Sequence, residues 1–290
     1  MKTRIINSVF LLVIVSLQAQ EVEKARQLES IEVFGQTIKY IEKGEGKTLI
    51  LLHGLGSNLE RWDNNIDDLS KEFNVIALDQ IGFGYSDKPT IPYRGATLVE
   101  FLNEFMNQKR IEKATLIGNS MGGWVASLFA IKHSEKVDKL VLVDPAFLLG
   151  LPKDANADEI YAFANPTTLE DMANYIKRIY YQNEELLKPE KLRKSLIKKL
   201  SWNDGYTVYQ TIQSLILGKD LMLGKLKDIS IETLIIQGKN DPIVPMKTIY
   251  TLKERIKNNV TIIYKNSGHS PMVEEPEKFN TDVLNFLNNE

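Results

Sequence analysis

Short runs of apolar residues recur along the chain. Each run spans four or five residues, is nearly continuously apolar and is bounded by segments of different pattern. A strand with this composition is buried on both faces, as in a parallel sheet. The pattern therefore predicts six buried strands, at Thr48–Leu52, Val75–Leu78, Ala114–Ile117, Leu140–Val143, Thr233–Ile236 and Val260–Ile263.

Helical patterns lie between most of these strands. Strands and helices that alternate in this way predict an α/β fold with a doubly wound sheet, whose ligands bind beyond the carboxyl ends of the strands. Ahead of the first buried strand, Ile31–Phe34 and Thr37–Ile41 alternate polar and apolar around Gly35, which predicts a hairpin with a type II′ turn. The predicted helices are Leu59–Lys71, Leu98–Arg110, Met121–His133, Met246–Lys257 and Glu277–Leu287.

Residues 147–226 interrupt the alternation, because they contain no buried strand. About 80 residues are too many for a loop, so we predict a helical subdomain inserted into a core formed by residues 20–146 and 227–290. The run of charges at Lys188–Lys199 is interpreted as a solvated helix face. Helical patterns within the insertion are Leu169–Tyr181, Pro189–Leu200 and Tyr206–Leu217.

The first 19 residues have the pattern of a secretory signal peptide. A basic start is followed by an apolar run, Ile5–Leu17, and then by small and polar residues. A helix needs about 20 apolar residues to span a bilayer, and this run is shorter. Its length therefore favours a cleaved signal peptide over an uncleaved anchor. We therefore expect export to the periplasm or the medium, with no stable membrane span after cleavage.

Composition excludes several classes of function. Lys and Arg number 36 and Asp and Glu number 38, so the net charge of −2 does not suit a nucleic-acid binder that relies on bulk charge. The chain has no cysteine. A disulfide scaffold, a cysteine-ligated zinc or iron–sulfur site and a cysteine nucleophile are therefore excluded.

The segment Gly118-Asn-Ser-Met-Gly122 carries the strongest candidate for chemistry. It lies between a buried strand and a helix, which is the context of a nucleophile elbow. The turn is tight, and glycines at both ends leave room for it. Ser120 is therefore the predicted nucleophile; the alternative is a serine that only caps the helix.

A serine nucleophile needs a base, and the chain has three histidines. His133 ends a predicted helix and is interpreted as a surface residue. His53 and His269 both follow buried strands, and either could face the site. The order of residues in this type of triad favours His269, which comes last, and leaves His53 to hold its loop.

The acid that orients the base should also follow a strand. Asp144 and Asp241 both fit, and we favour Asp241 because it ends the strand just before the histidine strand. The remaining aspartates considered lie in the insertion and are interpreted as surface charges or caps. They are Asp158, Asp171, Asp204 and Asp220.

With these motifs the chain resembles the α/β-hydrolase superfamily, in its capped esterase and meta-cleavage hydrolase branch. The resemblance covers residues 31–146 and 227–290. It implies the α/β-hydrolase fold, which is a mostly parallel sheet with the insertion as a helical cap. It also implies a reaction that needs no metal or cofactor. It also implies an oxyanion hole made by the N–H groups of Leu55 and Met121. The matching segments are His53–Gly56, Asp79–Ser86, Gly118–Gly123, Asp241 and Gly268–His269, of which Asp79–Ser86 is a structural turn.

The predicted activity is that of a carboxylesterase acting on small, uncharged, moderately hydrophobic esters. A C–C hydrolase of the meta-cleavage type is the first alternative, although such enzymes commonly have Trp where this chain has Ser270. A ligand-binding or signalling protein with little turnover is the second. The oligomeric state stays open. The substrate prediction rests on apolar positions at Phe147, Leu148, Leu149, Tyr161, Phe163, Leu217, Met272 and Val273.

Overall fold

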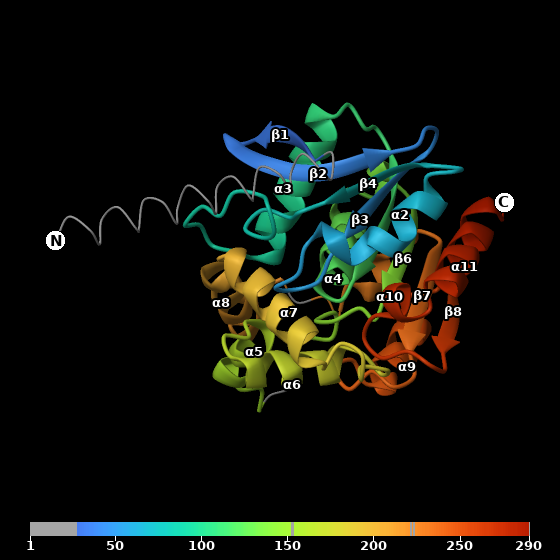
Figure 1. The fold of residues 1–290 in the computed structure, drawn as a ribbon. Coiled ribbons are helices and arrows are strands. Elements are labelled where there is room, and N and C mark those ends of the chain that lie inside the picture. Colours follow the sequence, from blue (N-terminus) through green and yellow to red (C-terminus); the bar gives the residue numbers. More distant parts are fainter. Residues whose placement is uncertain (1–27, 152–153, 221, 223, 290) are drawn as a thin grey trace.

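A central sheet organises the computed structural model, which describes residues 28–151, 154–220, 222 and 224–289. In this part of the chain eight strands pair in the order β1-β2-β4-β3-β5-β6-β7-β8 (Figure 1). Strands β1 and β2 are antiparallel and β3 to β8 run parallel, which confirms the predicted sheet. The strands are β1 (Glu29–Val33), β2 (Gln36–Lys43), β3 (Thr48–Leu52), β4 (Asn74–Leu78), β5 (Ala114–Asn119), β6 (Val137–Val143), β7 (Thr233–Gly238) and β8 (Asn259–Tyr264).

Helices cover both faces of this sheet. Because successive side chains of a strand point to opposite faces, Leu116 and Ile117 of β5 enter different hydrophobic clusters. Leu116 belongs with α3, α4 and α9, and Ile117 with α2 and α11. The helices of the core are η1 (Leu59–Trp62), α2 (Asp63–Leu69), α3 (Gly95–Gln108), α4 (Met121–Lys132), η2 (Ser134–Lys136), η3 (Leu226–Asp228), α9 (Met246–Arg255), α10 (Pro271–Glu274) and α11 (Pro276–Asn288).

The hairpin between β1 and β2 differs from its prediction. The register pairs Val33 with Gln36, so the loop consists of Phe34 and Gly35. Both have positive φ, 52° and 73°, which is the pattern of a type I′ turn. The predicted type II′ turn is wrong because Gly35 takes the second central position, not the first. Phe34 packs its ring edge-on against Phe101, with centroids 5.3 Å apart.

The inserted helices, α5 to α8, lie between β6 and β7 in the sequence and gather together beside the sheet (Figure 1, lower left). A capping box of Thr168 and Asp171 starts α6. The buried side of α6 packs Met172 and Ile176 against Leu196 of α7. The sequence pattern missed α5. The four helices are α5 (Ala157–Ala164), α6 (Leu169–Ile179), α7 (Pro189–Ser201) and α8 (Gly205–Ile216).

A buried ion pair corrects two sequence interpretations. Lys199 of α7 is only 5% exposed, and its Nζ lies 2.7 Å from Oδ1 of Asp204, which is 1% exposed. Lys199 is therefore not part of a solvated face, and Asp204 is not a surface charge. The two charges lie inside because each neutralises the other, which an unpaired buried charge could not do.

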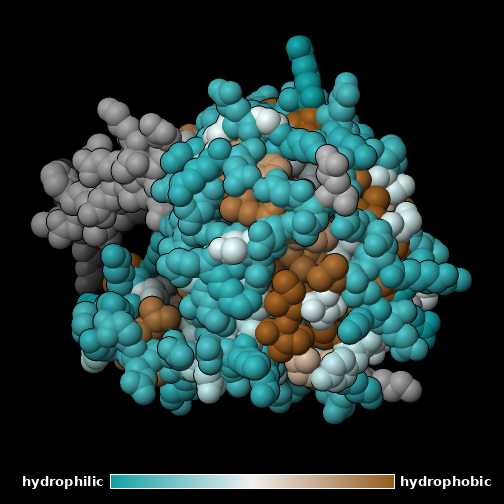
Figure 2. All heavy atoms as spheres, turned by 90° about the vertical axis from the view of Figure 1, so that its right-hand side faces the viewer, coloured by the Kyte–Doolittle hydropathy of each residue, from teal (hydrophilic) through white to brown (hydrophobic). Residues whose placement is uncertain are grey.

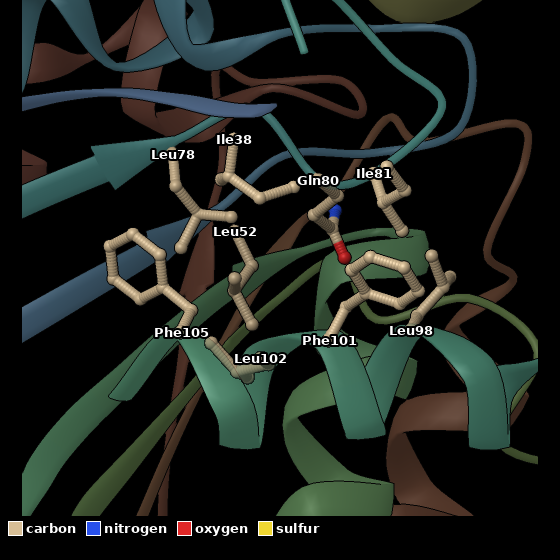
Figure 3. Close-up of a pocket in the computed structure, with 9 residues that line it drawn as sticks. All are labelled: Ile38, Leu52, Leu78, Gln80, Ile81, Leu98, Phe101, Leu102 and Phe105. Atoms are coloured by element: carbon tan, nitrogen blue, oxygen red, sulfur yellow. The ribbon is translucent and has the colours of Figure 1, made fainter. Parts of the chain in front are cut away.

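A small cavity lies between α3 and the sheet (Figure 3). Apolar side chains such as Ile38, Leu52 and Phe105 point toward one another there, with the amide of Gln80 among them. Its volume of about 10 Å³ is close to that of a single water site. It is a packing gap in the core and not a place for a substrate.

The predicted burial of Val260–Ile263 on both faces is wrong, because β8 is the edge strand of the sheet and Val260 is 51% exposed. Figure 2 shows the side of the molecule on which β8 and α11 lie: most of it is hydrophilic, and hydrophobic atoms gather in its lower central area. None of the helices in the described residues is both long and apolar enough to cross a membrane. The predicted signal peptide, residues 1–19, lies outside the described residues.

Candidate active site

Ser120 occupies a strained turn between β5 and α4. Its φ of 56° and ψ of −117° are rarely adopted by a residue with a side chain. A Cβ at Gly122 would lie 2.1 Å from the Leu52 carbonyl oxygen, and one at Gly118 would lie 2.3 Å from the Gly122 oxygen. Only glycine fits at either position. Ser120 makes no side-chain bond to the helix N-terminus, so it is not the simple cap of the alternative reading.

His269 and Asp241 form a close pair beyond the ends of β8 and β7. His269 Nδ1 lies 2.7 Å from Asp241 Oδ2, and both side chains are buried. The other carboxylate oxygen of Asp241 accepts the N–H groups of Ile243 and Val244, at 2.7 and 3.1 Å. Burial alone would raise the pKa of Asp241, but the interaction with His269 lowers it below its usual value. An ionised Asp241 accepts the hydrogen bond of Nδ1–H, which leaves Nε2 of His269 without a proton and able to act as a base.

Asp144, the other candidate acid, lies close to Asp241 and His269. Its Oδ1 accepts the N–H of Gly238 at 2.8 Å, whereas its Oδ2 has no partner among the described residues. One carboxylate oxygen each of Asp144 and Asp241 and one ring nitrogen of His269 lie within 4.8 Å of one another. Burial and the charge of Asp241 raise the pKa of Asp144 well above its usual range. Asp144 therefore keeps its proton more readily than Asp241, and the contact with His269 belongs to Asp241.

The loops that carry these residues are tied together through Asn119. Its Nδ2 donates to the carbonyl oxygens of Val143, at 3.1 Å, and of His269, at 3.3 Å. The N–H of Ser120 donates to the same Val143 oxygen, at 3.0 Å. The structure thus brings Ser120 and the His269 loop to one edge of the sheet. The described residues include no hydrogen bond between Ser120 Oγ and the His269 ring.

The segment after β3 passes directly against Ser120. A Cβ at Gly54 would lie 3.2 Å from the Cβ of Ser120. Leu55 follows in this loop, and Met121 is the first residue of α4, where N–H groups lack an acceptor inside the helix. The sequence named these two residues as oxyanion donors; Leu55 follows Gly54, which lies against Ser120, and Met121 directly follows Ser120 in the chain.

His53 has the structural role that the sequence suggested. It is fully buried, its Nδ1 donates to Gly54 O at 2.8 Å, and its Nε2 accepts the N–H of Gln80 at 3.1 Å. Burial lowers its pKa to about 4, so the ring is neutral. His133 also lies outside the site, but it is not the predicted surface residue. Its side chain is only 17% exposed and packs against Phe129.

Asp79 holds the turn that follows β4. Its two carboxylate oxygens accept the N–H groups of Leu59 and Tyr85, both at 2.6 Å. Its backbone carbonyl accepts the hydroxyl of Ser86 at 2.7 Å. The segment Asp79–Ser86 is thus a hydrogen-bonded turn, as its interpretation required.

Several residues near the site escaped the sequence analysis. Glu274 accepts the N–H groups of Gly268, at 2.8 Å, and Ser270, at 3.3 Å, and so shapes the histidine loop. Lys199 Nζ donates to the carbonyl of Gly56 at 3.0 Å. The contact of Lys199 joins segments that only the tertiary structure brings together. The contacts of Glu274 span six residues or fewer, but they depend on the turn that the histidine loop takes.

Comparison with known proteins is consistent with this geometry. Residues 47–276 match the family described as alpha/beta hydrolase fold. A 2-hydroxy-6-oxo-6-(2'-aminophenyl)hexa-2,4-dienoic acid hydrolase of Metapseudomonas resinovorans is 28% identical, over 93% of this chain and 95% of that protein. The structure of a meta-cleavage product hydrolase from Pseudomonas fluorescens has a TM-score of 0.80 and 29% identity, covering 90% of this chain and 97% of the other. A bacterial membrane phospholipase A has a TM-score of 0.82 and 26% identity, covering 99% and 98%.

Proposed function

Because the chain belongs to the α/β-hydrolase family, we propose that it is a serine hydrolase that cleaves carboxylic esters through an acyl-enzyme. One observation carries the proposal most directly. His269 is held by Asp241 at 2.7 Å, beside a loop that is tied to Ser120. An oriented base on a loop that is tied to a serine in a strained turn is the arrangement that activates a serine nucleophile.

The first half of the reaction acylates the enzyme. Ser120 Oγ attacks the ester carbonyl carbon while His269 Nε2 takes the hydroxyl proton. The ionised Asp241 stabilises the imidazolium that forms. The N–H groups of Leu55 and Met121 bind the oxyanion, each contributing about 3 kcal/mol to the stability of the transition state. The tetrahedral intermediate then breaks its bond to the alcohol oxygen, which receives the proton from His269.

The second half releases the acid. His269 takes a proton from water, whose oxygen attacks the acyl carbon. The bond to Ser120 then breaks, and His269 returns the proton to Oγ. The free acid and the original hydroxyl result, so the cycle needs only water as a second substrate.

The inserted helices fit the role of a cap over this site. The N–H of His269 donates to the carbonyl of Ile179, at the end of α6, at 2.9 Å. Lys199 of α7 reaches the carbonyl of Gly56, one residue after Leu55. Residues 147–226 are therefore proposed as a cap that contacts both the loop that carries His269 and the loop that carries Leu55, which we call the oxyanion loop.

A C–C hydrolase of the meta-cleavage type is the second candidate. It is supported by the relatives whose names state that reaction, at 28% and 29% identity. Ser120, His269 and Asp241 would serve it too, with a carbon leaving group in place of an alcohol. The two candidates therefore differ in substrate and not in the residues at the site.

Turnover of p-nitrophenyl acetate, butyrate and octanoate, set beside a 2-hydroxy-6-oxo-dienoic acid, tests the proposal. We expect kcat/KM for at least one ester to exceed that for the dienoic acid. The opposite order would replace ester cleavage by C–C cleavage. A folded protein that turns over neither class would point to the ligand-binding alternative.

A further inference from the structure

A cavity of about 230 Å³ lies between η1 of the core and helices α6 and α7. One water molecule needs a cavity of roughly 10–15 Å³, so this cavity has room for much more than one water. Gly56 and Ser57 line it, and they follow Leu55 directly in the oxyanion loop. Val273, four residues after His269, lines it as well. The cavity therefore adjoins the segments that form the candidate site.

Two donors at this cavity have no acceptor. Asn58 lines it and is 2% exposed, yet its Nδ2 has no partner among the described residues. Arg61 also lines it, and its Nε is likewise without a partner in that part of the chain. A buried donor without an acceptor costs free energy, so such groups in a folded protein call for an explanation. Here both could be satisfied by acceptor atoms of a ligand in the cavity.

Arg61 also lacks a hydrogen-bonded carboxylate among the described residues. Its terminal nitrogens donate to two phenol hydroxyls, of Tyr180 and, at 3.4 Å, of Tyr175. Neutral hydroxyls satisfy hydrogen bonds but do not cancel the charge. Glu274 acts on the guanidinium only through space, because its oxygens accept backbone N–H groups.

The other charges at the cavity are neutralised within the protein. Lys199 pairs with Asp204 at 2.7 Å, and Lys198 pairs with Glu60. Arg61 forms no such ion pair among the described residues, and Glu274 acts on its charge only through space. A guanidinium and an amide donor that line the same cavity suit a carboxylate, which has one negative charge and two acceptor oxygens.

We propose that this cavity binds a carboxylate carried by the substrate, with Arg61 and Asn58 as its donors. The inference rests on the proposed function, and it replaces the uncharged substrate that the apolar sequence positions suggested. Of those positions only Val273 lines the cavity. Leu148 is fully buried and Leu217 is 69% exposed, so neither shapes the cavity. The substrate class is thus a carboxylic ester whose far end is an acid.

Binding to Ser120→Ala, measured by titration calorimetry, tests this without turnover. The probes are the monomethyl and dimethyl esters of succinic, glutaric and adipic acid. We expect at least one monomethyl ester to bind ten- to a hundredfold, approximately, more tightly than its dimethyl partner. The chain length with the largest ratio reports the distance between Ser120 and the carboxylate site.

The ratio should fall close to one in Ser120→Ala with Arg61→Met. The matched control is Arg255→Met in the same background, since Arg255 is exposed on α9 and lines no part of the cavity. If circular dichroism shows that Arg61→Met is unfolded, Asn58→Ala serves instead and should lower the ratio several-fold. Equal binding of both ester types to Ser120→Ala, or a ratio that the folded variant leaves unchanged, would overturn the proposal. Because no hydrolysis is involved, the ratio can hold even if wild-type protein fails to cleave esters, which separates the two failures.

Discussion

The backbone of Ser120 is the clearest sign of function at the scale of one residue. Its φ of 56° is kept although a side chain makes that conformation costly. The surrounding contacts impose it: the N–H of Ser120 donates to Val143 and its carbonyl accepts from Gly123 and Ala146. Ser120 is 8% exposed, and its side chain makes no capping bond to α4.

Ser120→Ala should remove nearly all esterase activity and all covalent labelling by a fluorophosphonate. The chain has no cysteine that could replace the hydroxyl as nucleophile. Gel-based labelling of wild type and variant, with circular dichroism as the control for folding, measures this. Labelling of the variant at a rate near that of wild type would refute Ser120 as the nucleophile.

Asp241→Asn should lower kcat by a factor of about 10⁴, because an amide at this position presents the wrong hydrogen-bonding partner to Nδ1 of His269. Asp144→Asn should cost tenfold or less, approximately. The pKa of Asp144 is raised by burial and by the charge of Asp241, so an amide replaces a carboxyl that readily holds its proton, and its oxygen can still accept from Gly238.

Steady-state kinetics of the two folded variants decide between the carboxyls. The pair forms its own control, since both substitutions exchange carboxyl for amide within one buried cluster. A reversed order of effects would move the orienting acid to Asp144 and leave Ser120 and His269 in place.

At the scale of elements, the site depends on bonds between the loops that follow different strands. His53 joins the loops after β3 and β4, through Gly54 on one side and Gln80 on the other. Gln80 returns a bond from its side chain to the His53 carbonyl at 2.8 Å. The neutral His53 ring therefore fixes the loop that carries Leu55 to the loop after β4.

Lowering the pH should reduce the stability that neutral His53 gives to this loop, within a defined pH range. His53 has a pKa near 6.5 in an unfolded chain and about 4 in the fold, so protonation in between favours unfolding. The stabilisation is fully present above pH 6.5, approximately, and is lost as the pH falls toward 4. It amounts to about 3 kcal/mol for a shift of this size.

Urea unfolding at several pH values, for wild type and His53→Asn, measures that contribution. The free energy of unfolding of wild type should fall more steeply than that of the variant between pH 6.5 and 4. Parallel slopes for the two proteins would show that His53 does not titrate there.

At the scale of the whole molecule, specific contacts hold the inserted helices against the core. Lys199 provides one such link, because it bonds both to Asp204 at the start of α8 and to the Gly56 carbonyl of the core. Its amine is buried, so the link is not weakened by competing water. The cap and the oxyanion loop therefore share one buried charge pair.

Lys199→Met should destabilise the protein by 3–5 kcal/mol, approximately, since it leaves Asp204 buried without its partner. Thermal unfolding measures the loss. Lys194→Met is the matched control, because Lys194 lies on the same helix but is exposed, and its effect should stay within about 0.5 kcal/mol. Equal effects of both substitutions would remove the structural role of the pair.

Export is a prediction for the whole chain. If residues 1–19 are a cleaved signal peptide, protein from the native envelope or medium should begin near Gln20 or Glu21. Intact-mass measurement decides this. A mass that includes Met1 would favour the uncleaved anchor.

The sequence alone determined the sheet and the main motifs. Continuous apolar runs specify strands buried on both faces, and the glycines around Ser120 specify the turn, because these are local demands of backbone and side chain. Chain order then ranked His269 over His53 and Asp241 over Asp144. It could not show which carboxyl meets the ring, since Asp144 and Asp241 follow neighbouring strands of the same sheet.

Only the tertiary structure decided the rest. Lys199 and Asp204 are five residues apart, and Glu274 is six residues from Gly268, yet the local pattern does not show that these charges are buried or what they bond. The cavity at Arg61 forms between η1 of the core and helices α6 and α7, which are distant in the sequence. A charged residue looks the same in a sequence whether it is solvated, paired in the interior or left for a ligand. Burial and the identity of its neighbours separate these cases, because they set the cost of the charge, and both depend on how α6 and α7 pack against the core.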